Sequence, residues 1–374
     1  MIYLDYNATT PLIPEVKSRI ISTMDFFGNP SSLHIPGIMA KKVIEDARKS
    51  VASLINCNPE EIIFTSGGTE SDNIATIGFA ARFSSGHIIS SSIEHPAIIR
   101  PLKRLAQMGF DVTEVPVRAD GKIDPESIAG SIRKDTILIS IMHANNETGV
   151  IQPIKEISGI AKQNGITFHT DAAQSVGKID VDIKQLGVDL LSIAGHKYYG
   201  PKGIGAIYIK NGTKIDPVIF GASQERGISP GTENIMGIAG MAAASEVAPG
   251  EIKNRVNHAG ELRAILLGGL TEGIRDVHIN GNPESGLPNT LNISIKDIIA
   301  NDIVVRLKDK MAFSAGSACH SGQHSPSGVL KAMGLDDNNA IASIRLSVGK
   351  FNTRDEMIEA VKILSSEIGK IRGY

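Results

Sequence analysis

The stretch from Asp189 to Gly203, DLLSIAGHKYYGPKG, decides the fold of this 374-residue chain. Its first five residues form a short apolar run, as expected of a buried strand. The polar tripeptide Gly195-His196-Lys197 follows almost at once. A lysine at the end of a core strand is partly desolvated, which lowers its pKa and favours a neutral, nucleophilic amine. The stretch therefore predicts a buried strand followed by a functional site that contains Lys197. The alternative is that Lys197 is a surface lysine in a salt bridge.

Similar apolar and β-branched runs lie on both sides of this stretch and alternate with segments of helical periodicity. Strands are expected at residues 61–65, 87–91, 136–141, 166–170 and 204–209, and helices at 43–54 and 71–81. Alternation of strand and helix is typical of a mostly parallel sheet with helices on both faces. The sequence therefore predicts an α/β fold.

The character of the chain changes after Pro249-Gly250. An Ala- and Gly-rich helix is expected at 236–247 and a separate amphipathic helix at 251–270, followed by short strands near 277–280 and 289–294. We predict a large domain of residues 15–250 and a small α+β domain of residues 1–14 and 251–374.

Composition excludes several classes of protein. The chain has 38 Lys+Arg and 40 Asp+Glu, so the balance of 38 − 40 = −2 gives no net basic face for nucleic acid or acidic membranes. With 41% hydrophobic residues the chain can bury a core. Cys57 and Cys319 are too few for a disulfide framework, and neither a signal peptide nor a membrane helix is evident, so a cytoplasmic location is expected.

Polar clusters follow the expected strands at residues 66–73, 94–96, 144–149, 171–175 and 195–197. Ligands of open parallel sheets bind outside the carboxyl ends of the strands, so these clusters predict one crevice. Gly67-Gly68-Thr69 is suited to a phosphate, although a simple glycine turn is the alternative. Asp171 is suited to holding a pyridine nitrogen protonated and His95 to stacking on its ring, although each is also a common loop cap.

Cys319 lies in the segment 313–322, FSAGSACHSG, whose small residues predict a flexible loop and an accessible thiol. His320 and His324 are near enough in sequence to lower its pKa or to relay protons. The alternative for a free cysteine is a small buried hydrophobic residue, which is our interpretation of Cys57.

These motifs resemble the cysteine desulfurase and selenocysteine lyase family, pyridoxal-phosphate enzymes of the class V aminotransferase fold. The resemblance runs nearly end to end and includes the Cys319 loop. It rests on residues 3–11 (YLDYNATTP), 28–32 (GNPSS), 64–71 (FTSGGTES), 145–149 (NNETG), 169–174 (HTDAAQ), 195–197 (GHK), 231–234 (GTEN) and 343–349 (SIRLSVG). It implies the type I fold of pyridoxal-phosphate-dependent transferases, with a mostly parallel seven-stranded sheet in the large domain.

The resemblance also implies a role for each matching residue. Lys197 would carry pyridoxal 5′-phosphate as a Schiff base, Asp171 would pair with the pyridinium nitrogen, and His95 would stack on the ring. Cys319 would be the nucleophile that takes up sulfur. The remaining assignments are Gln174 and Asn146 for the phenolic oxygen side, Gly68, Thr69 and His196 for the phosphate, and Arg345 with Asn146 and Asn29 for the substrate.

By the same resemblance, Thr232 would reach the phosphate in a neighbouring subunit, which implies a homodimer. Two positions depart from the usual desulfurase pattern: Ala194 replaces a hydroxyl residue, and Ser229 replaces an arginine. Ala194 and the surroundings of Cys319 resemble selenocysteine lyases more than housekeeping desulfurases.

The expected reaction removes sulfur or selenium from L-cysteine or L-selenocysteine to give L-alanine, with the lyase favoured and a sulfur or selenium acceptor protein as partner. The alternatives are a housekeeping desulfurase that supplies persulfide for Fe–S clusters or tRNA thiolation, a class V aminotransferase, and a cofactor-free scaffold. No metal site is expected.

Overall fold

A computed structural model describes residues 1–315 and 325–373 of the chain, and its main sheet carries seven strands. They run in the order β2-β8-β7-β6-β5-β3-β4, and β8 alone is antiparallel to its neighbours. This confirms the predicted mostly parallel sheet. The strands are β2 (Ile62–Thr65), β3 (His87–Ser91), β4 (Asp111–Val115), β5 (Thr136–Ser140), β6 (Thr167–Asp171), β7 (Leu190–Ala194) and β8 (Gly205–Ile209).

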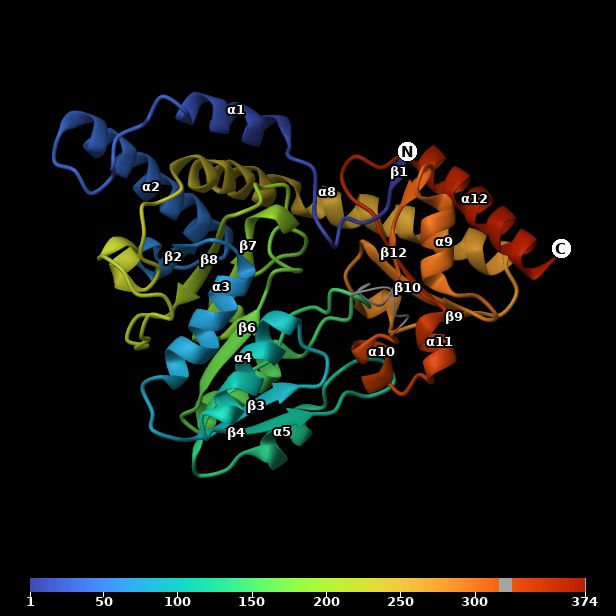
Figure 1. The fold of residues 1–374 in the computed structure, drawn as a ribbon, viewed down its shortest axis with the longest axis horizontal. Coiled ribbons are helices and arrows are strands. Elements are labelled where there is room, and N and C mark those ends of the chain that lie inside the picture. The colour runs from blue at the N-terminus through green and yellow to red at the C-terminus, as the bar shows by residue number, and fades with distance from the viewer. Residues whose placement is uncertain (316–324, 374) are drawn as a thin grey trace.

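Helices flank this sheet (Figure 1). They are α1 (Pro14–Thr23), α2 (Ile35–Leu54), α3 (Gly68–Asn73), α4 (Pro96–Gln107), α5 (Pro125–Ser131), α6 (Ile154–Gln163) and α7 (Ile183–Leu186). The helix expected at 71–81 is a short α-helix that continues as a π-helical turn over Ile74–Gly78. Helices α1 and α2 both pack on the long helix α8 (Ile235–Gly273).

The predicted break at Pro249-Gly250 is wrong, because α8 continues through it for 39 residues. An interior proline costs a helix about 3 kcal/mol. Tertiary packing outweighs that cost, because both halves of α8 are anchored in hydrophobic cores. Ile238 and Met241 pack in the core that includes residues of the main sheet, and Leu262 and Leu266 pack in the core of the second lobe.

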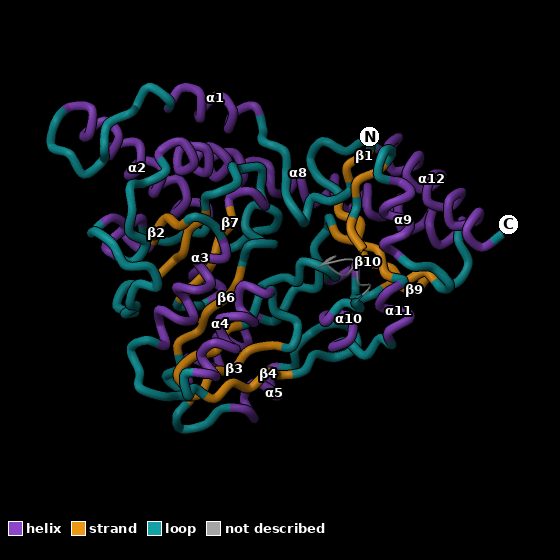
Figure 2. Tube along the Cα trace, in the orientation of Figure 1, coloured by secondary structure: helices purple, strands orange, loops and turns teal. Residues whose placement is uncertain are grey.

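The second lobe holds an antiparallel sheet in the order β12-β13-β10-β9, separate from the main sheet (Figure 2). Its elements are β9 (Val277–Ile279), β10 (Thr290–Ile295), α9 (Ala300–Leu307), β12 (Ser314–Ala315), α10 (Gly328–Ala332), α11 (Asp337–Ile341), β13 (Ser343–Ser347) and α12 (Arg354–Arg372). Strand β1 (Ile2–Tyr3) joins this lobe by pairing in parallel with β11 (Met311–Ala312).

The domain division remains a proposal that the hydrophobic clusters support. Ile2 and Leu4 are buried in the core of the second lobe, whereas Tyr6 and Ile13 are buried with the main sheet. We propose that the chain passes between the domains within residues 5–13 and again within α8, close to the expected boundaries. No helix among the described residues is both long and apolar enough to cross a membrane.

Candidate functional site

A cavity of about 370 Å³ lies where the carboxyl ends of β2, β3, β5, β6 and β7 meet, as the sequence predicted for the polar clusters. Strand β13 of the second lobe contributes Arg345 to the same cavity. The predicted site residues that line it are Gly68, Thr69, His95, Asn146, Asp171, Gln174, His196, Lys197 and Arg345. Nine predicted residues from distant parts of the sequence therefore line one cavity.

Lys197 reaches the cavity from a short 3-10 turn, Gly195–Lys197, that directly follows β7. Its Nζ donates hydrogen bonds to the carbonyl oxygens of Asn7 at 2.7 Å and Ala8 at 2.9 Å. Burial and the nearby Arg345 guanidinium lower the pKa of Lys197 to about 8. A large fraction of this amine is consequently neutral in mildly alkaline solution, as attack on an aldehyde requires.

Asp171 is the last residue of β6, and its Oδ1 accepts a hydrogen bond from the N–H of Ala173 at 2.9 Å. Burial raises the pKa of Asp171, so a cationic partner is needed to hold this carboxylate ionised. A protonated pyridine nitrogen is such a partner.

His95 is the N-cap of α4, and its Nδ1 accepts from the N–H of Ala97 at 3.1 Å. Desolvation lowers the pKa of His95, so the neutral ring carries its proton on Nε2. The side chain is exposed at the cavity, which leaves the ring available for stacking.

The turn after β2 has the features that a phosphate requires. Gly67 adopts φ +153°, and the N–H groups of Gly68 and Thr69 have no acceptor within residues 1–315 and 325–373. A Cβ at Gly68 would lie 3.4 Å from that of Ala194, so a larger residue would fill the space that both line. His196 lines the same cavity, and its Nδ1 lies 3.1 Å from Thr9 Oγ1. Together with Lys197 and Asp171, these donors fit pyridoxal phosphate.

Arg345 is held in place before any substrate arrives. Its Nη2 donates to Asp5 Oδ1 at 2.7 Å and to Ser314 Oγ at 3.0 Å, and its Nη1 donates to the carbonyl oxygen of Asn146 at 3.1 Å. Its Nε is buried and has no hydrogen-bond acceptor among the described residues. The fork is therefore oriented by its neighbours while it keeps donor capacity for a carboxylate.

Sequence reasoning assigned no role to Asn7 or Asp72, yet both line the cavity. The carbonyl oxygen of Asn7 accepts from Lys197 and from Gln174 Nε2 at 2.9 Å. Asp72 is buried, and its Oδ1 lacks a hydrogen-bond donor within the described ranges. Their positions inside the motifs 3–11 and 66–73 were the available signal, but the motifs alone do not say what each residue contacts.

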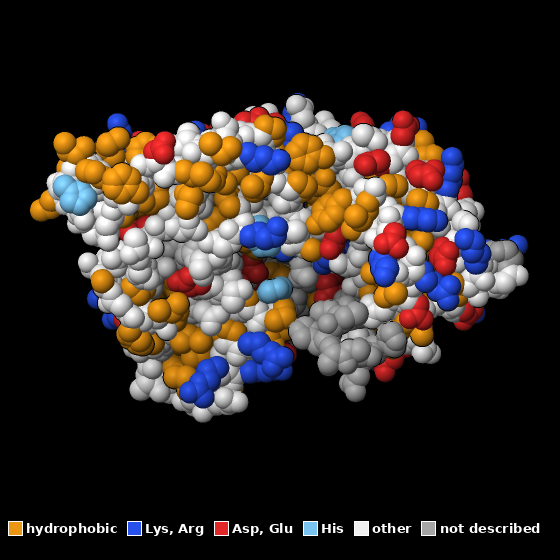
Figure 3. Space-filling model, turned by 45° about the horizontal axis from the view of Figure 1, so that its top comes forward, with side chains coloured by type: hydrophobic (Ala, Val, Ile, Leu, Met, Phe, Trp, Pro, Cys, Tyr) orange, Lys and Arg blue, Asp and Glu red, His pale blue; other side chains and the backbone are white. Residues whose placement is uncertain are grey.

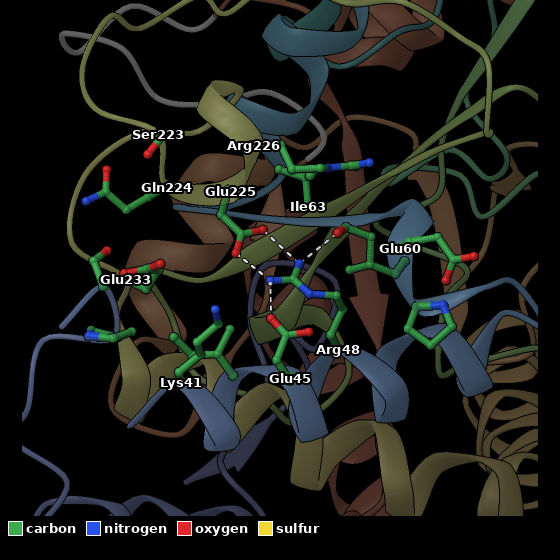
Figure 4. Close-up of a pocket in the computed structure, with 15 residues that line it drawn as sticks. Lys41, Glu45, Arg48, Glu60, Ile63, Ser223, Gln224, Glu225, Arg226 and Glu233 are labelled. Atoms are coloured by element: carbon green, nitrogen blue, oxygen red, sulfur yellow. Dashed lines mark hydrogen bonds and ion pairs between the residues drawn. The ribbon is translucent and has the colours of Figure 1, made fainter. Parts of the chain in front are cut away.

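Thr232 does not line this cavity. It is exposed beside a different cavity that also contains Ser229, whose Oγ donates to Glu70 Oε1 at 2.7 Å. The preceding turn is anchored by Glu225, which pairs with Arg48 at 2.7 Å, as Figure 4 shows. The structure of one chain therefore gives no support for a contact between Thr232 and the cofactor cavity.

Two further groups of predicted residues are not brought to the cavity. Asn29 is exposed between α1 and α2, where its Oδ1 accepts from the N–H of Ser31, so the structure gives no support for a substrate contact within one chain. Cys319, His320 and His324 lie outside the described residues.

Comparison with known proteins agrees with this geometry. The family model described as aminotransferase class-V matches residues 2–360. Cysteine desulfurase IscS of Dictyoglomus turgidum is 45% identical over 375 residues, which cover 99% of this chain and 95% of that protein. Its namesake from Methanosarcina thermophila is 44% identical, with 99% and 93% covered.

A solved structure of a NifS-like protein has a TM-score of 0.92 with this chain at 37% identity, covering 98% of this chain and 99% of that one. The family model, the similar solved structure and the residues that line the cavity therefore point to the same kind of enzyme. The chain belongs to the class-V aminotransferase family and, within it, to the pyridoxal-phosphate-dependent cysteine desulfurases.

Proposed function

We propose that the enzyme converts L-cysteine to L-alanine and transfers the sulfur atom to Cys319. The observation that carries the proposal is the meeting of Lys197, whose pKa is lowered to about 8, with Asp171 and Arg345 in one cavity. An amine, a carboxylate and a guanidinium are the groups needed to hold the cofactor, stabilise its charged ring and bind an amino-acid carboxylate.

Each residue then has a defined task. Bound pyridoxal phosphate supplies an electron sink for the bond broken at the substrate Cα. Arg345 orients the carboxylate, and Lys197 Nζ removes the proton from Cα. The Cys319 thiolate attacks the substrate sulfur, so the new S–S bond forms as the C–S bond breaks, and the electron pair of that bond stays with the substrate carbon. Protonation of that carbon gives alanine and leaves a persulfide on Cys319.

Cysteine is preferred to selenocysteine in this proposal. The sequence favoured a selenocysteine lyase because of Ala194 and the surroundings of Cys319, but the two relatives described above are named cysteine desulfurases. Their names support the alternative of a housekeeping desulfurase, in which an acceptor protein takes the persulfide sulfur. The predicted cytoplasmic location is compatible with that role.

A homodimer is part of the proposal, because the exposed apolar side chains of one face support it. Phe27 is 85% exposed and Leu33 94%, and Ile35 and Ile38 are exposed nearby in sequence. Figure 3 shows hydrophobic side chains gathered over α1 and α2. Large exposed apolar patches mark interaction surfaces. A second copy on this face would allow Thr232 to act in the partner's site.

Alanine release from L-cysteine and from L-selenocysteine, measured side by side, tests the reaction. We expect turnover of L-cysteine by the unmodified enzyme and loss of that turnover in Cys319→Ala. Cys57→Ala is the matched control and should keep its activity, because Cys57 does not line the cavity. Alanine release from L-cysteine that survives in Cys319→Ala would contradict the proposal. Turnover of L-selenocysteine without turnover of L-cysteine would instead support a selenocysteine lyase.

A further inference from the structure

Lys178 lies next to the cavity and has no role in the reaction described above. Its Nζ donates to Gln174 Oε1 at 2.6 Å and to Asn7 Oδ1 at 3.0 Å. Both acceptors are neutral amide oxygens, and no carboxylate pairs with Lys178 within the described part of the chain. The amine is therefore directed at two residues of the cavity wall rather than at an ionic partner.

The surroundings of Lys178 disfavour its charged form. The cations that face it are Lys197 and Arg345, and burial together with these two charges holds its pKa well below the usual range. An amine in such a place contributes little as an ion-pair partner. What it supplies in either protonation state is a hydrogen-bond donor at a fixed position.

That donor fixes which end of the Gln174 amide is directed at Lys178. Lys178 occupies Oε1, so the Nε2 group is turned to the other side, where it donates to the Asn7 carbonyl oxygen at 2.9 Å. Asn7 is fixed in turn, because its Oδ1 accepts from both Lys178 and Asn289 Nδ2 at 2.9 Å. An amide rotated by half a turn would place its oxygen against the Asn7 carbonyl oxygen and its N–H groups against the Lys178 amine, so both hydrogen bonds would be lost as they stand.

We infer that Lys178 is a positioning residue that fixes the Gln174 amide with its N–H donors, rather than its oxygen, available to the cofactor. The inference rests on the proposed function and on the contact between Gln174 and the phenolic oxygen side of pyridoxal phosphate that the family resemblance implies. A donor at that place stabilises the phenolate anion, whereas an amide oxygen would repel it. Lys178 thus controls the protonation behaviour of the bound cofactor without touching it.

Lys178→Met tests the inference, since methionine has similar length and no donor. The measurement is the visible absorbance of the holoenzyme as a function of pH. Loss of a hydrogen bond to a charged oxygen should move the midpoint upward by about one pH unit. Lys184→Met, the same change at an exposed lysine on α7, should leave the midpoint unchanged. An unchanged midpoint in Lys178→Met would overturn the inference.

A double-mutant cycle shows whether Lys178 acts through Gln174. In a Gln174→Leu background, Lys178→Met should move the midpoint by less than half of the shift seen alone, because coupled residues are not additive. A shift of half or more in that background would mean that Lys178 does not act through this amide, and the inference would fail.

Lys178→Gln is the second variant, for use if Lys178→Met does not fold. It keeps an N–H donor, so its midpoint should stay within about 0.3 pH unit of the unmodified enzyme, since roughly the same hydrogen bond is kept. A larger shift in Lys178→Gln would overturn the inference. If the unmodified protein binds no pyridoxal phosphate at all, the proposed function itself fails, and the two failures are thereby distinguished.

Discussion

The surroundings of Lys197 favour the neutral amine that must attack the cofactor aldehyde. Two backbone carbonyl oxygens orient its Nζ, and burial together with Arg345 brings its pKa from 10.5 to about 8. The protonated amine is therefore the dominant form below pH 8, and the neutral amine dominates above it. The rate of any reaction that needs the lone pair of the amine should therefore increase as the pH rises through about 8.

The rate of pyridoxal phosphate uptake by the apoprotein should follow that titration. We expect the rate to rise with pH from about 6.5 and to level off above about pH 9, because half of Lys197 is neutral at about pH 8 and nearly all of it is neutral one unit higher. The measurement is the growth of visible absorbance after mixing. A rate that still rises roughly sevenfold between about pH 9 and 10 would show an unperturbed lysine.

Arg345 should matter more for substrate binding than for the chemical step. Arg345→Lys keeps the charge but loses the planar fork that Asp5 and Asn146 orient. We expect the KM for L-cysteine to rise at least about tenfold, with kcat changed by less than about threefold. Arg354→Lys, an exposed control on α12, should change neither constant. A kcat that falls with KM unchanged would contradict a carboxylate-binding role.

Residues at strand ends were predictable, because parallel strands bring their carboxyl ends to one edge whatever their order in the sheet. The neighbours of those residues were not. Lys178 contacts Asn7 across 171 positions of sequence, and Lys197 contacts the same residue across 190. Contacts of this kind arise only once the chain has folded, so no local pattern indicates them.

Strand β4 and helix α8 show where local patterns fail. Asp111–Val115 forms the edge of the main sheet, where four of its five residues keep some exposure, so it lacks the apolar run that marked the inner strands. Pro249-Gly250 indicated a helix end, yet α8 continues because packing at both ends outweighs the local preference. Buried strands such as β7 were predictable because burial on both faces leaves an apolar run.

The turn that joins Gln174 to Lys178 depends on one glycine. Gly177 has φ +73°, and a Cβ there would lie 2.6 Å from Tyr198 Cβ. Gly177→Ala should therefore lower the free energy of unfolding by at least about 2 kcal/mol, measured by denaturant unfolding. Gly250→Ala is the control: it lies in α8 with nothing close to its added methyl group, and it should stabilise by about 0.5 kcal/mol. If both changes altered the free energy of unfolding equally, the turn would not depend on Gly177.

The whole molecule consists of two lobes that share one long helix (Figure 1). Residues of both lobes line the cavity. The main sheet supplies Lys197 and Asp171, and the second lobe supplies Arg345. Thr232 faces a different cavity of the same chain. In the proposed homodimer, Thr232 of a second copy that covers the apolar face near α1 and α2 would complete the site.

Disruption of that face should separate the subunits and weaken cofactor binding together. We expect the double variant Phe27→Ser and Leu33→Ser to be monomeric in sedimentation and to bind pyridoxal phosphate at least about tenfold more weakly, since a phosphate hydrogen bond from Thr232 is lost. Met108→Ser, at an exposed residue after α4, should remain dimeric. A monomer with unchanged cofactor affinity would exclude a role for Thr232 across the interface.

The attachment point of the cofactor is the sharpest test of the role of Lys197. The holoenzyme is reduced with borohydride, digested, and examined by mass spectrometry for a lysine that carries the pyridoxyl group. We predict that the group is found on Lys197 and that Lys197→Ala carries none. A pyridoxyl group on Lys178 or on any other lysine, or a protein that takes up no cofactor, would contradict the account.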